Sequence, residues 1–144
     1  MIQLTGLRPK GITALSIFFA AGAVISFTSS ASLFFPESFL EPMWRLNPRA
    51  LEAFHSMGGW AIVMLCTVCA GCAFAAVGLW RGVRWGYRLA LGILVINLTG
   101  DIANVVLGTE PRAAIGIPIV LLILAFLLTR RVKSFFNRPI VKIE

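Results

Sequence analysis

Long apolar segments separated by short polar connections dominate the pattern along this chain. Four of these segments are long enough to cross a membrane as helices, at residues 11–33, 55–80, 88–108 and 113–130. A helix rises about 1.5 Å per residue, so even the shortest segment reaches about 27 Å, close to the roughly 30 Å hydrocarbon core of a bilayer. The pattern therefore predicts an all-α fold, a membrane-spanning four-helix bundle formed by one domain.

The connection between the first two spans is the longest, at residues 34–54. Its three prolines interrupt any continuous helix. Asn47 followed by Pro48 is typical of a helix start, with Asn as the N-cap and Pro in the first turn. The helix that starts there is expected to bend at Gly58 and Gly59 as it enters the membrane.

The first apolar segment also has the features of a secretory signal peptide. Ser29 and Ala31 give a small-residue cleavage pattern after the basic residues Arg8 and Lys10. The apolar stretch is longer than the 7 to about 15 residues usual in the core of such peptides, which favours a retained span. Cleavage would leave three spans with the same orientation.

Composition supports a membrane location. The chain of 144 residues is 58% hydrophobic and 13% charged, whereas soluble domains are about 45 to 50% apolar and about 25% charged. The net charge of +7 comes from Lys and Arg clustered in the connections, while a nucleic-acid-binding protein would present them on a soluble face. We therefore expect no nucleic-acid partner.

The distribution of basic residues predicts the orientation. Ten of the thirteen Lys and Arg residues lie before the first span, in the 81–88 hairpin or after residue 129. Cytoplasmic connections carry such an excess. Both termini and a basic tail at 131–144 are therefore predicted on the cytoplasmic side, with the 34–54 loop outside.

Basic and aromatic residues gather at this predicted cytoplasmic interface. Aromatic rings suit the headgroup level, and Lys and Arg side chains there attract anionic lipids. The residues are Trp80, Arg81, Arg84, Trp85, Tyr87, Arg88, Arg130, Arg131 and Lys133. Topology setting and anchoring to anionic head groups account for all of them, and binding to a cytoplasmic partner is the alternative.

Four sequence motifs together resemble those of small four-span bacterial membrane proteins of uncharacterised function. They are RPKG at 8–11, GLWRGVRWGYRLALGIL at 78–94, GDIANVVLG at 100–108 and VKSFF at 132–136. The resemblance covers most of the chain and implies a multi-pass protein of the bacterial inner (plasma) membrane with a compact helical bundle. It supplies no catalytic residues.

Asp101 is the residue within the spans that points most directly to chemistry. Ionisable groups inside a membrane are costly and usually face the bundle interior or a water-filled cavity. Asn97 and Asn104 share its helical face, four residues before it and three after it. We favour an interhelical clamp, and proton or ion handling is the alternative. At the depth of Asp101 in the membrane, the residues expected beside it on the other spans are Ser26 or Thr28, Cys66 or Cys69, and residues 116–118.

His55 and Glu52 form a second candidate near the outer mouth. They lie three residues apart on one helix face, where imidazole could serve as a pH sensor or a metal ligand. One His and one Glu are too few ligands for a metal site. We favour an interfacial, hydrogen-bonded histidine, with a proton path to Asp101 as the alternative.

Cys66, Cys69 and Cys72 have the spacing of a metal or redox motif. On a helix, however, they spread over about 120° and do not converge on one metal. We interpret them as a small-residue packing surface that faces Gly22, Ser26 and Ser30, which are spaced by four in the first span.

The sequence contains no phosphate loop, no Ser/His/Asp set and no HExxH motif, so no cofactor or metal site is predicted. The favoured function is a non-catalytic accessory, scaffolding or assembly component, acting as a homo-oligomer or beside a larger membrane complex. The second hypothesis is a proton-coupled or small-solute transport element built on Asp101. A membrane redox enzyme is the third.

Overall fold

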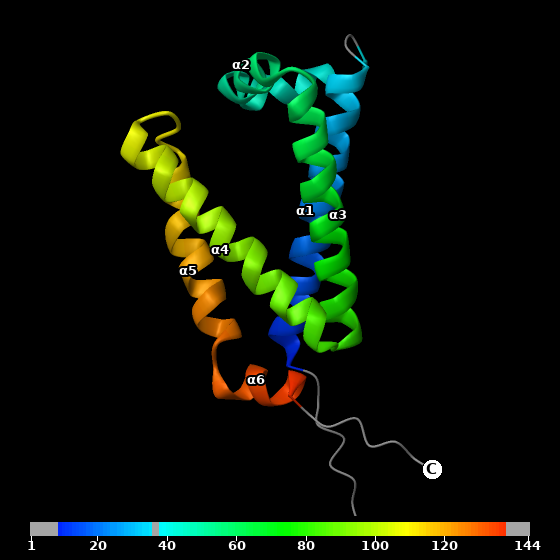
Figure 1. The fold of residues 1–144 in the computed structure, drawn as a ribbon, viewed down its shortest axis with the longest axis vertical. Coiled ribbons are helices and arrows are strands. Elements are labelled where there is room, and N and C mark those ends of the chain that lie inside the picture. The colour runs from blue at the N-terminus through cyan, green and yellow to red at the C-terminus, as the bar shows by residue number, and fades with distance from the viewer. Residues whose placement is uncertain (1–8, 36–37, 138–144) are drawn as a thin grey trace, which may run out of the picture.

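The computed structural model of the chain describes residues 9–35 and 38–137 (Figure 1). These residues contain helices, turns and loops but no strand, which confirms the all-α class. The helices follow one another as α1 (Lys10–Phe34), the 3-10 helix η1 (Glu41–Leu46), α2 (Pro48–Met57), α3 (Gly59–Arg81), α4 (Arg84–Leu107), α5 (Ala113–Leu127) and α6 (Arg130–Phe136).

Within the described ranges, α1, α3 and α4 are long and apolar enough to cross a membrane, which indicates a membrane protein. The fourth apolar segment is shorter than predicted. Its helix α5 has 15 residues and ends at Leu127, and the chain then bends by 61° into α6. The helix breaks at Thr129, which has an extended ψ of 146°. If the bent pair of α5 and α6 is one span, the number of candidate spans rises to four.

The predicted start and bend of the second helix are confirmed. The Asn47 side chain accepts a hydrogen bond from the Ala50 backbone N–H at 3.2 Å, and Pro48 occupies the first turn. Gly58 has a φ of +57°, so the helix ends at Met57 and α3 begins afresh at Gly59. The apolar span therefore starts at residue 59 and not at residue 55.

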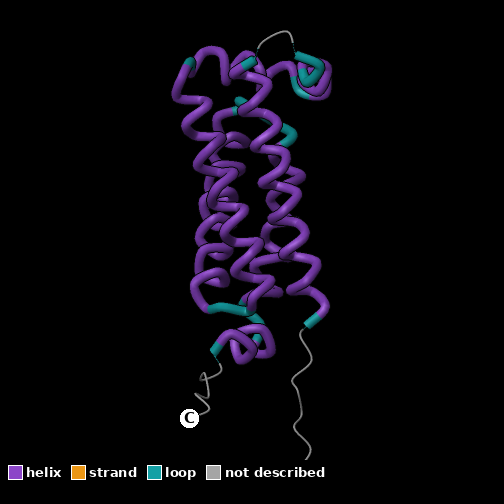
Figure 2. The backbone as a smooth tube through the Cα atoms, turned by 90° about the vertical axis from the view of Figure 1, so that its right-hand side faces the viewer, coloured by secondary structure: helices purple, strands orange, loops and turns teal. Residues whose placement is uncertain are grey.

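The helices α1 and α3 pack along each other for most of their length (Figures 1 and 2). Small polar residues mediate this contact. The Ser16 hydroxyl donates a hydrogen bond to the Ala76 carbonyl at 2.7 Å, and Ser30 Oγ and Cys66 Sγ are hydrogen-bonded at 3.3 Å. Such residues let two backbones approach closely, so this pair forms one rigid arm of the molecule.

The helices α4 and α5 form a second arm, which leans away from the first (Figure 1). The two arms meet where α3 turns into α4. The backbones of Gly78 and Gly86 are so close there that a Cβ on Gly78 would overlap the Gly86 backbone. Gly82 makes the turn with a φ of +67°, which glycine adopts without strain. From this close crossing the helix axes separate, so the arrangement differs from the compact bundle that the resemblance implies.

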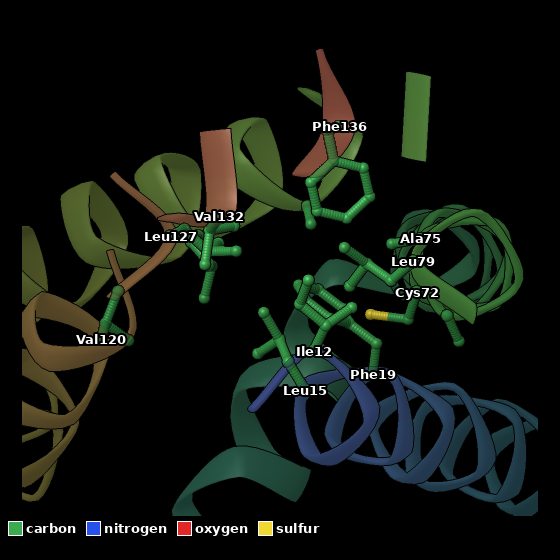
Figure 3. Close-up of a cluster of buried hydrophobic side chains, with 13 residues drawn as sticks. Ile12, Leu15, Phe19, Cys72, Ala75, Leu79, Val120, Leu127, Val132 and Phe136 are labelled. Carbon is green, nitrogen blue, oxygen red and sulfur yellow. The ribbon is translucent and has the colours of Figure 1, made fainter. Parts of the chain in front are cut away.

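The buried apolar core lies where the arms converge (Figure 3). It joins side chains from both arms and from α6, which folds back beneath them. Its members include Ile12, Leu15 and Phe19 of α1, Cys72, Ala75 and Leu79 of α3, Val120 and Leu127 of α5, and Val132 and Phe136 of α6. We call this the basic end, because the hairpin and α6 carry its arginines. The opposite end, formed by η1, α2 and residues 108–112, is called the open end.

Candidate functional site: the polar face of α4 and the basic end

The polar residues of α4 continue the face with which this helix meets α3. Near the basic end Gly86 touches Gly78, and Ile93 Cδ1 lies 3.4 Å from the position of a Cβ on Gly71. Asn97 is four residues beyond Ile93, so it lies on the same side of the helix. Asn104 follows two turns further on, in the last turn of α4. This end of α4 lies away from α3 (Figure 1).

This divergence leaves the polar face uncovered. Asn97 and Asn104 are exposed, and Asp101 between them is half-buried. The sequence correctly suggests one common face for the three residues, but that face does not lie in a closed bundle interior. The physical reason is the crossing at Gly78 and Gly86, which sets α4 at an angle to α3.

Asp101 contacts α5. Its Oδ2 atom lies 2.6 Å from the position that a Cβ on Gly116 would take, so the carboxylate occupies the space that glycine leaves open. Gly116 is one of the neighbours expected at this depth. Others are engaged elsewhere: Thr28 donates to the Val24 carbonyl, and Cys66 bonds to Ser30. Among the described residues the Asp101 side chain has no hydrogen-bond or ion-pair partner, so its contact with α5 is steric.

Asn104 has a structural role at the end of α4. The Thr109 hydroxyl donates to Asn104 Oδ1 at 2.9 Å, and the Thr109 backbone N–H donates to the Asn104 carbonyl at 3.0 Å. Gly108, with a φ of +69°, completes this helix cap. The Asn97 side chain, by contrast, forms no hydrogen bond within residues 9–35 and 38–137.

The outer-mouth candidates Glu52 and His55 are both exposed on α2. Over the described part of the chain, no group of three or more His, Cys, Asp or Glu side chains converges. The predicted path from His55 to Asp101 has no hydrogen-bonded intermediate there. The two residues remain an exposed pair on a helix that lies across the open end (Figure 1).

The three cysteines lie around α3 as the packing interpretation requires. Cys72 is buried, and its Sγ atom lies 3.6 Å from the position of a Cβ on Gly22 of α1. Cys69 is half-buried, and Cys66 is exposed and bonded to Ser30. The α1 residues opposite Cys72 and Cys66 are therefore small, which allows the close approach of the two helices.

At the basic end, two predicted lipid anchors bind the chain itself. Arg84 donates through Nε to the Phe136 carbonyl at 2.9 Å and through Nη2 to the Asn137 carbonyl at 2.8 Å. The Tyr87 hydroxyl donates to the Leu127 carbonyl at 3.0 Å, and its ring stacks on Phe136 with a centroid distance of 4.9 Å. Arg84 and Tyr87 therefore hold α6 against the hairpin.

We call these contacts of Arg84 and Tyr87 the clasp. The sequence analysis did not predict the clasp, although the spacing of apolar residues in this segment indicates a docked helix. Val132 and Phe136 are four residues apart and are the buried residues of α6, a spacing that indicates an amphipathic helix. The predicted basic tail is thus a docked helix up to Phe136, and residues 138–144 lie outside the described part of the chain.

The remaining predicted interface residues lie on the surface of the basic end. All are exposed, and they comprise Trp80, Arg81, Trp85, Arg88, Arg130, Arg131 and Lys133. They come from three elements that the clasp brings together, namely the end of α3, the start of α4 and α6 (Figure 1). The clasp thus builds one basic and aromatic surface from separate segments.

Comparisons with protein-family models, with curated proteins and with solved structures find no match to this chain. The fold and composition define its class as an α-helical protein with membrane-length apolar helices. The function must be argued from the polar face of α4 and from the basic end.

Proposed function

We propose that this chain is a multi-pass integral membrane protein that acts as a non-catalytic accessory, scaffolding or assembly component through the polar face of α4. In this proposal the bent pair of α5 and α6 contributes a fourth span, and both termini are cytoplasmic. The bacterial inner membrane is the location that the resemblance implies. The basic residue count supports the orientation, because Lys and Arg concentrate on the cytoplasmic side.

The observation that carries the proposal is the exposed carboxamide of Asn97 in a membrane-length helix. A polar group in hydrocarbon is costly, and helices in membranes satisfy such groups by hydrogen bonds to other helices. Within the described residues Asn97 has no such bond. A carboxamide both donates and accepts, so a second copy or another membrane-spanning chain could pair with it.

The test is the purification of the full chain in native lipid, with mass spectrometry of the intact assembly. We expect a stable self-oligomer or a stoichiometric partner chain for the wild type, and its loss in Asn97→Leu. Thr99→Leu is the matched control, because Thr99 is exposed on another face and its hydroxyl bonds to Val95 of its own helix at 2.9 Å. A monomeric wild type without partner, or an Asn97→Leu assembly that is unchanged, would contradict the proposal.

The proposed orientation has a separate test with paired reporters. One reporter follows Glu144, and the other is inserted in the 34–54 loop. We expect the first to report from the cytoplasm and the second from outside. An outward-reporting C-terminus would reject the orientation without bearing on the assembly surface.

A second candidate function is proton or small-solute transport, which the environment of Asp101 favours. The carboxylate touches Gly116, two residues before Pro118 in α5. Proline lacks an N–H and so removes one backbone hydrogen bond of that helix. A titratable group therefore adjoins a stretch of helix with weakened backbone bonding.

The variants Asp101→Asn and Asp101→Leu separate the two functions. For a non-catalytic component we expect no proton flux in liposomes for the wild type and greater stability of Asn than of Leu, because Asn keeps size and polarity. Wild-type flux that Asn abolishes while the protein remains stable would favour transport.

A further inference from the structure

An apolar groove separates α1 from α5 at the basic end. It has a volume of about 320 Å³, in the lower range of small-molecule sites. Its lining is Gly11, Ala14, Leu15 and Phe18 of α1 with Leu122, Ile123 and Phe126 of α5. No ionisable side chain takes part in this lining.

The local sequence explains why the groove forms. Gly11 has no side chain, so the Phe126 ring lies directly against its backbone and α5 meets α1 at this point. Further along, α1 stays with α3 while α5 stays with α4, so the two helices do not pack along each other (Figure 1). Phe18 is 50% exposed and Leu122 is 72% exposed, which leaves an apolar rim open to the membrane.

Two exposed cations lie close in sequence to residues that line the groove. Lys10 directly precedes Gly11, and Arg130 follows Phe126 by four residues. Both side chains are exposed, and long basic side chains at such positions extend to the headgroup level. An apolar groove at an end of the molecule that carries these cations matches a molecule with an apolar chain and an anionic head.

We propose that this groove binds one acyl chain of an anionic phospholipid, whose headgroup contacts Lys10 and Arg130. The groove is too small for a transmembrane helix, which is about 10 Å wide. The proposal rests on the membrane embedding given under Proposed function, with the basic end at the headgroups, and is independent of assembly through α4.

The test counts lipids on the full chain reconstituted in bilayers of equimolar phosphatidylglycerol and phosphatidylcholine, by native mass spectrometry after mild delipidation. We expect one phospholipid to stay bound per chain, with about a 25-fold preference for phosphatidylglycerol from the two basic residues together. Each basic residue near an anionic surface favours binding by on the order of fivefold. Equal retention of both lipids by the wild type would overturn the proposal.

Two variants probe the two parts of the site. Ala14→Trp fills the groove and should remove the retained lipid, whereas Ala20→Trp places the same side chain on another exposed position of α1 and should not. The double variant Lys10→Gln with Arg130→Gln should abolish the preference for phosphatidylglycerol and leave the fold intact, because both residues are exposed.

The charge control is Arg81→Gln with Arg88→Gln, which removes the same charge from exposed positions at the same end. We expect this pair to keep the wild-type preference. Equal losses in the two double variants would instead show a general attraction to an anionic surface and would overturn the proposed site. Lipid is counted on each monomer, so a failure of assembly through Asn97 leaves this result readable.

Discussion

The two ends of the molecule are built in different ways. At the basic end, Gly78 and Gly86 touch through their backbones, and the side chains of Arg84 and Tyr87 bind α6. At the open end, one side-chain hydrogen bond links η1 to the connection between α4 and α5, from Arg112 Nη1 to the Leu46 carbonyl at 3.4 Å. A hollow of about 510 Å³ lies beside it, between residues 47–49 and 110–112.

The difference shows how glycine position decides where two helices converge. A Cβ on Gly78 or Gly86 would overlap the opposite backbone, whereas nothing lies within 4 Å of the positions for Gly92 and Gly100. The four glycines belong to the same hairpin, yet only those near its turn allow close contact. The polar residues beyond them remain available to other molecules because the arms have already separated.

The largest expected effect comes from breaking the basic end at its closest contact. Gly78→Leu should destabilise the fold by about 3 kcal/mol or more, since overpacking costs about 1 to 3 kcal/mol and here the obstacle is backbone. Reversible unfolding in mixed micelles, followed by tryptophan fluorescence, measures this. Gly100→Leu is the control and should be neutral or slightly stabilising, because leucine is the better helix former. Similar losses in both variants would contradict the comparison of the two ends.

A smaller effect is expected from releasing α6. Arg84→Gln removes two charge-assisted hydrogen bonds, which should lower the local stability of α6 by about 1 to 2 kcal/mol, near the lower part of the usual range because Arg84 is exposed. Hydrogen exchange of residues 130–136 measures this directly. Arg88→Gln removes a neighbouring exposed charge and should leave the exchange unchanged. Unaltered protection of α6 from hydrogen exchange in Arg84→Gln would show that the stacking of Tyr87 on Phe136 is enough to hold this helix.

Local features of the fold could be predicted from the sequence because they depend on neighbouring residues. The N-cap at Asn47 and the break at Gly58 follow from the chemistry of those residues and their neighbours. The common face of Asn97, Asp101 and Asn104 follows from helical periodicity. Apolar length predicts α1, α3 and α4 in the same way.

The arrangement of the arms could not be predicted, because it depends on contacts between distant segments. From the sequence, Arg84 is expected only to help set the orientation in the membrane. Its hydrogen bonds to residues 136 and 137 become known only from the structure. In the same way, the contact of Asp101 with Gly116 depends on how α5 folds back. The exposure of Asn97 depends on an angle between helices that periodicity does not encode.

Replacing the cysteines tests the packing of α3 against α1, between the two ends of the molecule. Replacing Cys66, Cys69 and Cys72 together with Ala should cost about 1 kcal/mol, most of it from Cys72, because only its thiol is buried and leaves a small void. Single variants, measured by the same unfolding assay, show how this loss of stability is divided among the three cysteines. Metal analysis of the purified wild type is the decisive comparison, since a stoichiometric metal that the triple variant loses would overturn the packing interpretation.

The smallest effect is expected at the open end, from Arg112→Gln. Its bond to the Leu46 carbonyl is long and exposed, and surface substitutions of this kind usually change stability by no more than about 0.5 kcal/mol. The distance between spin labels at Trp60 of α3 and Val106 of α4, one on each arm, should therefore be the same in wild type and variant. Both labelled positions are exposed, and the same label pair in Arg84→Gln controls for effects at the other end. A broad increase in distance in Arg112→Gln alone would mean that this bond limits the separation of the arms. The two arms would then be joined at the open end, and this bond would control the access to Asn97 on which the proposed assembly depends.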